Sequence, residues 1–461
     1  MFSRNSPTVK KLKMLIGKDG VGFLEICLRS LDEILPHTTT EPWRVTKGED
    51  APAATWDGNT RRGIRLVIRI QLNKGKQTYS FVLKSTLRRK IAASLGSAVE
   101  RTLDDNEKSI CSQVVIRASD IIGSKRNDFD AESLRAIGKL FKEQVVASHL
   151  RQSCELNIDV AGLFATLREL AEQSYENKSL SYGLVISKKK TKQTPSLRFP
   201  IDFLRFKRYR AMSDGYRTAF TITANGKVES LDDLEDLSES HHEGRYYPEW
   251  CRFIAEASCN ARCSISLTRQ GDILVFVDGS MRFTYRRGKW QYWNHRHAEN
   301  LLTDSARAKH VDTRHVKAVV RQLYKSAIDV SFRRTGGLFI LLCNKIHLRK
   351  IVPQGDAIKD KKRERAHVAF DKSLADQTVA SIPRLIRAEL AALDGAIVVD
   401  NRNKVLAYGA VLKSPPGSKV DSAEGSRSKA AKAASEFGLA IKVSSDGDIT
   451  IYRKGITLLE L

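Results

Sequence analysis

The sequence predicts an α/β (α+β) protein: a mixed-sheet α/β sandwich at the C-terminus, preceded by a small antiparallel β meander and an α+β N-terminal region. Three observations carry this prediction. Helical and strand periodicities alternate along residues 312–452, as expected for helices packed on a sheet. Short strand-like runs joined by Gly turns fill residues 264–290. Segments with helical spacing surround a hairpin pattern near the N-terminus.

The N-terminal region, residues 1–240, combines predicted helices with hairpins. Residues 64–72 (IRLVIRIQL) alternate with a period of two and are followed by a second strand pattern at residues 78–83. We therefore expect a hairpin with Arg65 and Arg69 on its exposed face. Helical spacing predicts helices over residues 22–35, 131–149 and 160–175. Asp130 and Asp159 are expected to cap the second and the third of these helices.

The rest of this region is predicted to be β structure followed by an acidic segment. Residues 181–187 have the composition of a strand, and Asn225-Gly226 is a strong two-residue turn for a hairpin within residues 218–228. Residues 229–239 (ESLDDLEDLSE) come next. They predict either a domain boundary or a solvated helix.

A small β module is predicted for residues 241–305. Its strands cover residues 264–267, 272–277 and 282–285, and Gly279 and Gly288 lie in the turns before and after the third. Trp290 follows the last turn.

The third region, residues 306–461, shows the clearest alternation of elements. Asp312 is expected to cap a helix whose core face is formed by Val316, Val319, Leu323 and Ala327. Further helices are predicted over residues 379–393 and 426–437, and strands over residues 337–342, 346–352, 396–399, 405–412, 440–443 and 449–452.

The composition narrows the class of protein. The chain has 461 residues, and its 78 Lys+Arg against 53 Asp+Glu give a formal net charge of +25, which predicts an anionic partner such as a nucleic acid or nucleotide. No apolar run approaches the roughly 18 residues of a membrane span, and the N-terminus lacks the apolar core of a secretory signal. Seven cysteines are an odd and sparse set. We therefore expect a cytoplasmic protein with reduced thiols and no membrane partner.

Two motifs in the C-terminal third carry the chemistry. Asp394-Gly395-Ala396 lies at a predicted helix-to-strand junction, where glycine permits close approach of a ligand and the carboxylate can hold a metal or a hydroxyl. Gly425-Ser426-Arg427-Ser428-Lys429 places two hydroxyls and two cations on the first turn of a helix, which is a ready phosphate site. Taken alone, the second motif is more often that of an ordinary Ser-capped helix with a solvated basic turn.

Together, and in this order, the motifs resemble the diadenylate cyclase (DAC) domain, as found in the N-terminal domain of the DNA-integrity scanning protein. That family has a GALIVI-type strand, a DGA motif, a G-T-R-H-R-x-A motif and final strands of V-S…I-V-T-x-Y type. The corresponding segments here are residues 336–341 (GGLFIL), 393–400 (LDGAIVVD), 425–431 (GSRSKAA) and 443–452. The resemblance covers about residues 312–461.

The resemblance implies a concrete activity. Active members condense two ATP molecules into cyclic di-AMP across a face-to-face pair of domains, with Mg²⁺ or Mn²⁺ assisting, so a homo-oligomer is expected. Carried over, Asp394 would be the catalytic and metal-binding residue. The nucleotide-binding residues would be Gly395, Ala396, Gly425, Ser426, Arg427, Ser428, Lys429 and Ser444. Phosphoryl transfer rests mostly on positioning and charge neutralisation, which suits this set of residues.

The chain departs from the family at one point. Where the family has Arg-His-Arg, it has Arg427-Ser428-Lys429, so the histidine is absent and a lysine replaces the second arginine. Divergent relatives are thought to be nucleotide sensors in bacterial conflict systems. The favoured hypothesis is a protein that binds an adenine nucleotide or a cyclic dinucleotide and signals to its N-terminal region. The alternative is an active diadenylate cyclase.

Two other candidate sites remain. Residues 198–210 (RFPIDFLRFKRYR) interleave aromatic and basic residues, so Arg205, Lys207, Arg208 and Arg210 form a candidate nucleic-acid patch, or the solvated edge of a core element. A nucleic-acid-binding protein is accordingly the second alternative. Cysteines and histidines between residues 241 and 297 lack paired zinc-ligand spacing, and buried thiols with surface imidazoles explain them more simply.

Overall fold

The computed structural model is an α/β protein, as predicted, and it divides into two compact units. The first unit comprises Met1–Arg89, Glu100–Arg245 and Cys251–Trp293, and the second comprises Lys90–Val99, Tyr246–Trp250 and Asn294–Leu461. This division differs from the predicted boundaries at residues 240 and 305. The structure describes residues 7–34, 38–47, 53–60, 63–74, 77–87, 104–124, 131–188, 197–200, 202, 209, 212–236, 244–306, 312–358, 360–362, 368, 371, 374, 377–413 and 425–461.

Two larger sheets form most of the β structure described in the first unit. The four-stranded sheet has the order β1-β4-β3-β2 and contains the predicted hairpin, β3 paired antiparallel with β4. The seven-stranded sheet has the order β13-β12-β11-β10-β7-β8-β9, so the predicted meander shares one sheet with the strands before it. Their bounds are β1 (Thr38–Lys47), β2 (Ala53–Thr60), β3 (Gly63–Lys74), β4 (Gln77–Leu87), β7 (Tyr182–Ser187), β8 (Thr218–Ile222), β9 (Val228–Asp233), β10 (Ala261–Leu267), β11 (Ile273–Val277), β12 (Ser280–Arg286) and β13 (Lys289–Tyr292).

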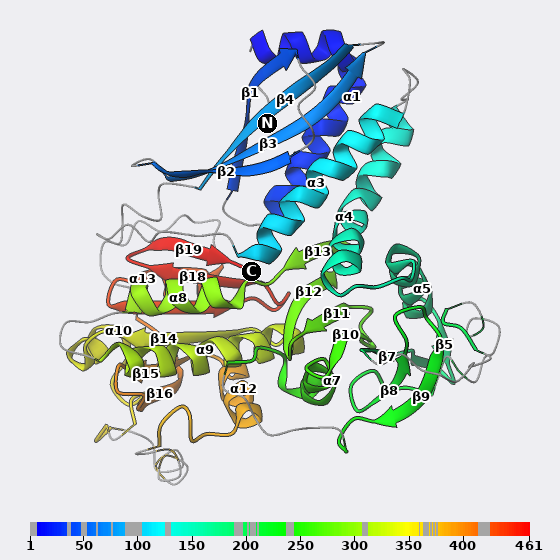
Figure 1. Cartoon of the computed structure of the whole chain (residues 1–461). Coiled ribbons are helices and arrows are strands. Elements are labelled where there is room, and N and C mark those ends of the chain that lie inside the picture. The colour runs from blue at the N-terminus through cyan, green and yellow to red at the C-terminus, as the bar shows by residue number, and fades with distance from the viewer. Residues whose placement is uncertain are drawn as a thin grey trace. The chain divides into compact units, whose positions relative to one another are not determined.

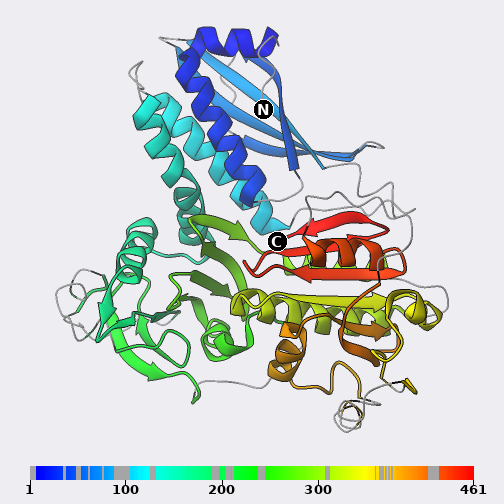
Figure 2. The same ribbon diagram turned by 180° about the vertical axis from the view of Figure 1, so that it is seen from behind.

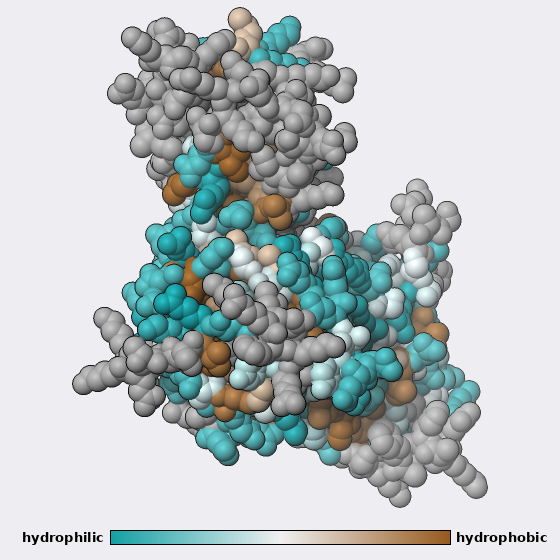
Figure 3. All heavy atoms as spheres, turned by 90° about the vertical axis from the view of Figure 1, so that its right-hand side faces the viewer, coloured by the Kyte–Doolittle hydropathy of each residue, from teal (hydrophilic) through white to brown (hydrophobic). Residues whose placement is uncertain are grey.

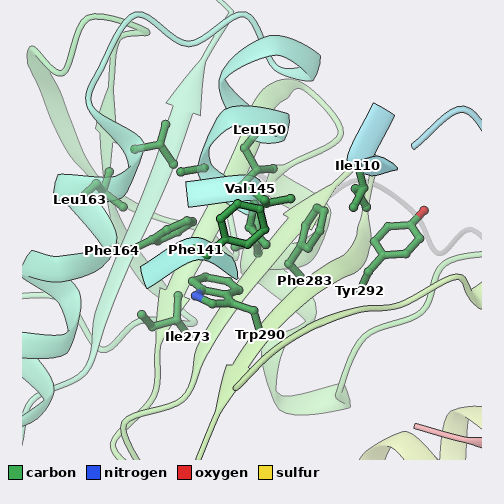
Figure 4. Close-up of a cluster of buried hydrophobic side chains, with 14 of the residues drawn as sticks. Ile110, Phe141, Val145, Leu150, Leu163, Phe164, Ile273, Phe283, Trp290 and Tyr292 are labelled. Atoms are coloured by element: carbon green, nitrogen blue, oxygen red, sulfur yellow. The ribbon is translucent and has the colours of Figure 1, made fainter. Parts of the chain in front are cut away.

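Helices pack on the seven-stranded sheet through one apolar core (Figure 4). Phe141 and Val145 of one helix meet Phe164 of the next, and Trp290 of β13 packs against Phe164 with ring centroids 4.5 Å apart. Asp159 caps the last of these helices by accepting from the backbone N of Gly162, as predicted. The helices are α1 (Pro7–Ile34), α3 (Asp105–Ser124), α4 (Ala131–Ser153), α5 (Val160–Ala171) and the short α7 (Arg252–Ala257), and a two-stranded ribbon of β5 (Ser174–Tyr175) and β6 (Lys178–Ser179) follows α5.

The second unit is built on a six-stranded mixed sheet. Its order is β16-β15-β14-β17-β18-β19, with β14 and β15 parallel and every other neighbouring pair antiparallel. The strands are β14 (Gly337–Leu342), β15 (Ala396–Asp400), β16 (Val405–Ala410), β17 (Gly438–Val443), β18 (Ile449–Arg453) and β19 (Ile456–Glu460), the last of which the sequence did not predict.

Helices cover both faces of this sheet, as a sandwich requires (Figures 1 and 2). Alternate residues of β14 point to opposite sides, so Leu338, Ile340 and Leu342 face one layer while Phe339 faces the other. The first layer holds α10 (Leu348–Ile351) and α13 (Ser426–Ala434). The second layer holds α8 (His295–Ala306), α9 (Thr313–Arg333) and α12 (Arg384–Ala392).

Several elements match their predictions in detail. Asp312 caps α9 by accepting from the backbone N of Arg314, and all four expected core residues of that helix are buried. The strand predicted over residues 346–352 is wrong. That segment forms a 3-10 turn, Lys345–His347, and then α10, because Asn344 accepts a hydrogen bond from the backbone N of Ile346 and starts a helical turn there.

Three further predictions are corrected in the same way. The helix predicted from residue 379 begins at Arg384, because Pro383 occupies its N-cap. The hairpin around Gly226 is present, but its loop has three residues, since the N of Thr223 donates to the carbonyl of Lys227 and Gly226 takes a φ of 79°. Residues 229–233 of the acidic segment belong to the strand β9, in which Asp232 accepts from the hydroxyl of Thr221, and residues 237–239 lie outside the described residues.

The face shown in Figure 3 is mostly polar where its residues are described. In the view of Figure 3, hydrophilic residues predominate and the apolar patches between them are small. Within the part of the chain that the structure describes, no helix is long and apolar enough to cross a membrane.

Candidate nucleotide-binding site

The DGA motif lies where α12 passes into β15. Gly395 has a φ of 118°, and a Cβ atom there would overlap the carbonyl carbon of Gly409 and lie 2.6 Å from the backbone N of Ala410. Only glycine tolerates both the conformation and the contact. Ala396 is buried in the first position of β15, opposite Ala410 of β16. The turn therefore leaves Asp394 at the edge of the sheet, with a fully exposed side chain.

The GSRSK motif opens α13. Gly425 is the N-cap, and its carbonyl accepts from the backbone N of Ser428 at 3.0 Å and of Lys429 at 3.2 Å. The N–H groups of Ser426 and Arg427 belong to the first turn, where helix N–H groups have no partner inside the helix and point outward. This N-terminus also carries two cations, so it can attract a phosphate group through both hydrogen bonds and charge.

The structure brings three motif segments together at Arg427. Its Nη2 lies 3.5 Å from Oδ1 of Asp394, although the two residues are 33 positions apart. A Cβ atom on Gly336, which has a φ of 73°, would overlap Nη1 of Arg427. The guanidinium therefore lies against the glycine that precedes β14. The sequence predicted Asp394 and Arg427 as site residues, and the structure places them next to one another.

The pair formed by Arg427 and Asp394 is open to solvent. The side chain of Arg427 is 34% exposed and that of Asp394 fully so, at the long separation of 3.5 Å. An ion pair of this kind contributes little to stability, because water competes with both partners. Either group can turn toward a ligand at small energetic cost.

Lys442 is a neighbour of the motif residues that the sequence analysis missed. It lies on β17, and its Nζ donates to the hydroxyl of Ser428 at 3.0 Å. The signal for it was present, because Lys442 is the single charged residue in the otherwise apolar strand GLAIKV. It adds a cation beside Ser428. With Arg427 and Lys429, three cations surround the start of α13.

Ser444 has a turn-forming environment. Its hydroxyl accepts from the backbone N of Asp448 at 3.0 Å, and its carbonyl accepts from the N of Gly447 at 2.9 Å. Ser445, the next residue, has its backbone N 3.4 Å from the Cβ position of Gly336. The turn between β17 and β18 thus approaches the motif cluster through Ser445.

A buried ionic anchor lies at the other end of α12. Arg384, the first residue of that helix, binds both carboxylate oxygens of Asp329 at 2.8 and 2.9 Å. It also contacts Oε2 of Glu249 at 2.8 Å and donates to the carbonyl of Tyr247 at 2.8 Å. Burial raises the pKa of Asp329 above its ordinary value, with Arg384 opposing that rise. This anchor holds the segment Tyr246–Trp250, whose sequence neighbours on both sides belong to the first unit.

Other candidate residues stand as follows. A Mg²⁺ or Mn²⁺ ion that arrives with a nucleotide needs only one or two protein carboxylates, and Asp394 can supply one. Among the described residues, no group of three or more His, Cys, Asp or Glu residues could hold a metal ion. Cys251 and Cys263 are buried thiols. The candidate nucleic-acid residues Arg205, Lys207, Arg208 and Arg210 lie outside the described residues.

Comparisons with known proteins found weak similarity to solved structures alone. No protein-family model matches the chain, and no curated protein matches it. One similar structure is a hypothetical membrane spanning protein from Bacillus cereus, with 20% identity, 35% of this chain and 74% of that chain covered, and a TM-score of 0.24. Another is a double mutant of DacA from Staphylococcus aureus, with 20% identity, 31% of this chain and 87% of that chain covered, and a TM-score of 0.23.

Proposed function

We propose that the second unit, which contains the C-terminus, binds an adenine nucleotide or a cyclic dinucleotide, and that binding is signalled to the N-terminal region. One observation carries the proposal: Arg427 of the GSRSK motif lies against Gly336 and 3.5 Å from Asp394 of the DGA motif. Residues from three separate segments therefore share one location, at which the side chains of Asp394 and Arg427 reach solvent. The proposal also rests on the resemblance of these segments to the DAC domain.

The residues have complementary roles in such a site. The N–H groups at the start of α13 and the side chains of Arg427 and Lys429 would take the phosphates. Asp394 would accept a ribose hydroxyl or hold the Mg²⁺ or Mn²⁺ that accompanies the nucleotide, whose chemistry is to neutralise phosphate charge. Lys442 would keep Ser428 turned toward β17 through their hydrogen bond of 3.0 Å.

A route for the signal is built into the chain. Asp394 follows α12 by two residues, and α12 begins at Arg384, which anchors Tyr247 and Glu249. A shift of α12 on binding would therefore act on a segment that continues in both directions into the first unit. Such a device needs a ligand that favours one position of α12 over another.

A second candidate function is diadenylate cyclisation itself. The observation that favours it is the exposed carboxylate of Asp394 next to the cation of Arg427, because the DAC resemblance implies a carboxylate beside the reacting hydroxyl and an arginine on the phosphates. In that case two copies of the chain meet, each holding one ATP. The replacement of histidine by Ser428, itself bonded to Lys442, favours the sensor over the enzyme.

One experiment separates these functions. Purified protein is incubated with ATP and Mn²⁺, products are identified by mass spectrometry, and binding of ATP and of cyclic di-AMP is measured by calorimetry. We expect saturable binding without turnover, weakened about tenfold or more in Arg427→Ala. Arg402→Ala is the matched control, because Arg402 is exposed beyond the opposite end of β15, after Asp400.

Each outcome decides between the two functions. Cyclic di-AMP from the wild type but not from Asp394→Ala would establish the cyclase. Binding that is lost equally in Arg427→Ala and Arg402→Ala would show a general charge effect and no site. Failure of the wild type to bind either nucleotide would overturn the proposal.

A further inference from the structure

The first unit contains a polar cleft of about 510 Å³, remote in sequence from the motifs above. Its walls come from α3, α4, the loop that follows α4, and β10. This volume falls within the range of about 300–1,000 Å³ that is usual for ligand sites. The residues that argue for a ligand are Arg117 of α3, Arg151 of α4, Glu155 of the loop and Arg262 of β10.

The cleft carries an excess of positive charge. Its lining has three arginines against one glutamate, so its net formal charge is +2. The partner of Arg117 is a neutral hydroxyl: its Nε and Nη2 donate to Oγ of Ser148 at 3.0 and 2.9 Å, which leaves the charge of the guanidinium uncompensated. Arg151 lies in the last turn of α4 and is exposed.

Arg262 and Glu155 form the most informative contact. Nη1 of Arg262 lies 2.6 Å from Oε2 of Glu155 and donates to the carbonyl of Cys154 at 3.2 Å. The Nε of Arg262 is buried and has no hydrogen-bond partner in the described structure. Glu155 itself is 79% exposed, so water competes strongly for its carboxylate. A phosphate oxygen could displace this carboxylate and form an ion pair with the largely buried guanidinium of Arg262.

The rest of the lining indicates what part of a ligand is recognised. The amides of Gln113 and Gln152, which bond each other at 2.9 Å, lie in the same wall and can donate to phosphate or sugar oxygens. None of the residues that line the cleft is aromatic. Base stacking is the usual device for holding single-stranded bases, so this cleft lacks it and is suited to phosphate and sugar contacts.

We propose that this cleft is a second anion-binding site, which binds the phosphate or phosphodiester group of a nucleotide or of a nucleic-acid strand. The arginine fork matches phosphate geometry better than a point charge does. The site does not depend on the proposed nucleotide site of the C-terminal unit, since none of its lining residues belongs to that unit.

The test uses the full-length chain with two probes. A labelled short single-stranded oligonucleotide is titrated by fluorescence anisotropy at low and moderate salt, and ATP is titrated by calorimetry into an Arg427→Ala background. Arg151→Glu should weaken the binding of at least one probe by about tenfold or more and reduce the salt dependence of strand binding. Glu155→Gln should tighten binding, because it removes the carboxylate that competes for Arg262.

The controls make the result specific. Arg269→Glu introduces the same charge change at an exposed arginine of the same unit outside the cleft, and we expect it to weaken binding by much less. Thermal melting confirms that the variants remain folded. Hydrogen exchange should show protection by the bound probe at residues 151–157.

The outcomes are distinct. Binding of the oligonucleotide alone identifies a strand as the ligand, and binding of ATP in the Arg427→Ala background identifies a free nucleotide. Equal weakening by Arg151→Glu and Arg269→Glu, or no binding of either probe to the wild type, would overturn the proposal. Loss of oligonucleotide binding in Arg427→Ala but not in Arg151→Glu would also overturn it.

Discussion

Two of the arginine–aspartate pairs in the second unit, Arg384–Asp329 and Arg427–Asp394, are built in opposite ways. Arg384 binds both oxygens of Asp329 at 2.8 and 2.9 Å, and the aspartate is 3% exposed. Arg427 reaches one oxygen of Asp394 at 3.5 Å, and that aspartate is fully exposed. The first pair is saturated by further contacts to Glu249 and Tyr247. The second pair keeps most of its hydrogen-bonding capacity directed to solvent.

This difference separates a structural role from the binding role that we propose for Arg427 and Asp394. A buried charge must be fully paired, because an unpaired one costs several kcal/mol, so the anchor at Asp329 has no capacity left for a ligand. An exposed and loosely paired charge stabilises the fold little, yet it can exchange its partner for a phosphate or a metal at low cost. Both pairs flank α12, so the same helix joins the anchor to the candidate site.

The largest expected effect comes from breaking the anchor. Asp329→Ala leaves the largely buried Arg384 with Glu249 as its remaining carboxylate partner, and we expect the free energy of unfolding to fall by about 3 kcal/mol. Asp394→Ala is the matched variant at the other pair and should leave stability unchanged while weakening nucleotide binding. Urea denaturation of both variants measures the difference. Equal loss of stability in the two variants would refute the contrast between the pairs.

A smaller effect is expected from the backbone that presents Asp394. Gly395→Ala puts a Cβ into the backbone of Gly409 and Ala410 at a φ of 118°, and it should cost about 1–3 kcal/mol. Gly425→Ala is the control, since no atom lies within 4 Å of its Cβ position and its φ is −62°. It should cost below about 1 kcal/mol. Denaturation midpoints would rank the two, and a more damaging Gly425→Ala would show that the DGA turn is not strained.

Much of the second unit could be predicted from the sequence because its signals are local. The cap at Asp312, the period of α9 and the apolar run of β14 each depend on residues within a few positions of one another. The prediction of a strand after β14 was wrong because it, too, depends on local signals. Its apolar residues allow a strand, but the side chain of Asn344 starts a helical turn, and Ile346 ends 75% exposed.

The residues of the candidate site also differ in whether a local pattern predicts them. Asp394 and Arg427 could be found because each lies in a contiguous motif. Lys442 could not, since its role depends on α13 packing against β17, which brings the side chain of Lys442 to Ser428. The cleft of the first unit was missed entirely, because it joins residues as far apart as Gln113 and Arg262, and no local pattern marks such a juxtaposition.

The smallest expected effect concerns Lys325, a lysine close to Arg384 of the anchor, and the dependence of stability on pH. Burial, followed by the nearby charges of Arg384 and Arg321, lowers the pKa of Lys325 to about 8, although Glu249 opposes this and the ring of Tyr246 lies 5.8 Å from its Nζ. Between that value and the ordinary value of 10.5, the unfolded chain holds a proton that the folded chain has released. Stability therefore rises with pH across this window, by about 1 kcal/mol for a partly exposed group.

Lys325→Met removes this titration, so the variant should lack that part of the rise. The measurement is the difference in unfolding free energy between wild type and variant, followed by urea denaturation from neutral pH to about 10. Other lysines and tyrosines titrate in both proteins and cancel in the difference. The free energy of unfolding of the wild type should rise relative to that of the variant as pH increases, because the buried ammonium of Lys325 is neutralised. A difference that stays flat with pH would mean that Lys325 keeps an ordinary pKa, and that the region around Asp329 tolerates an additional cation without cost.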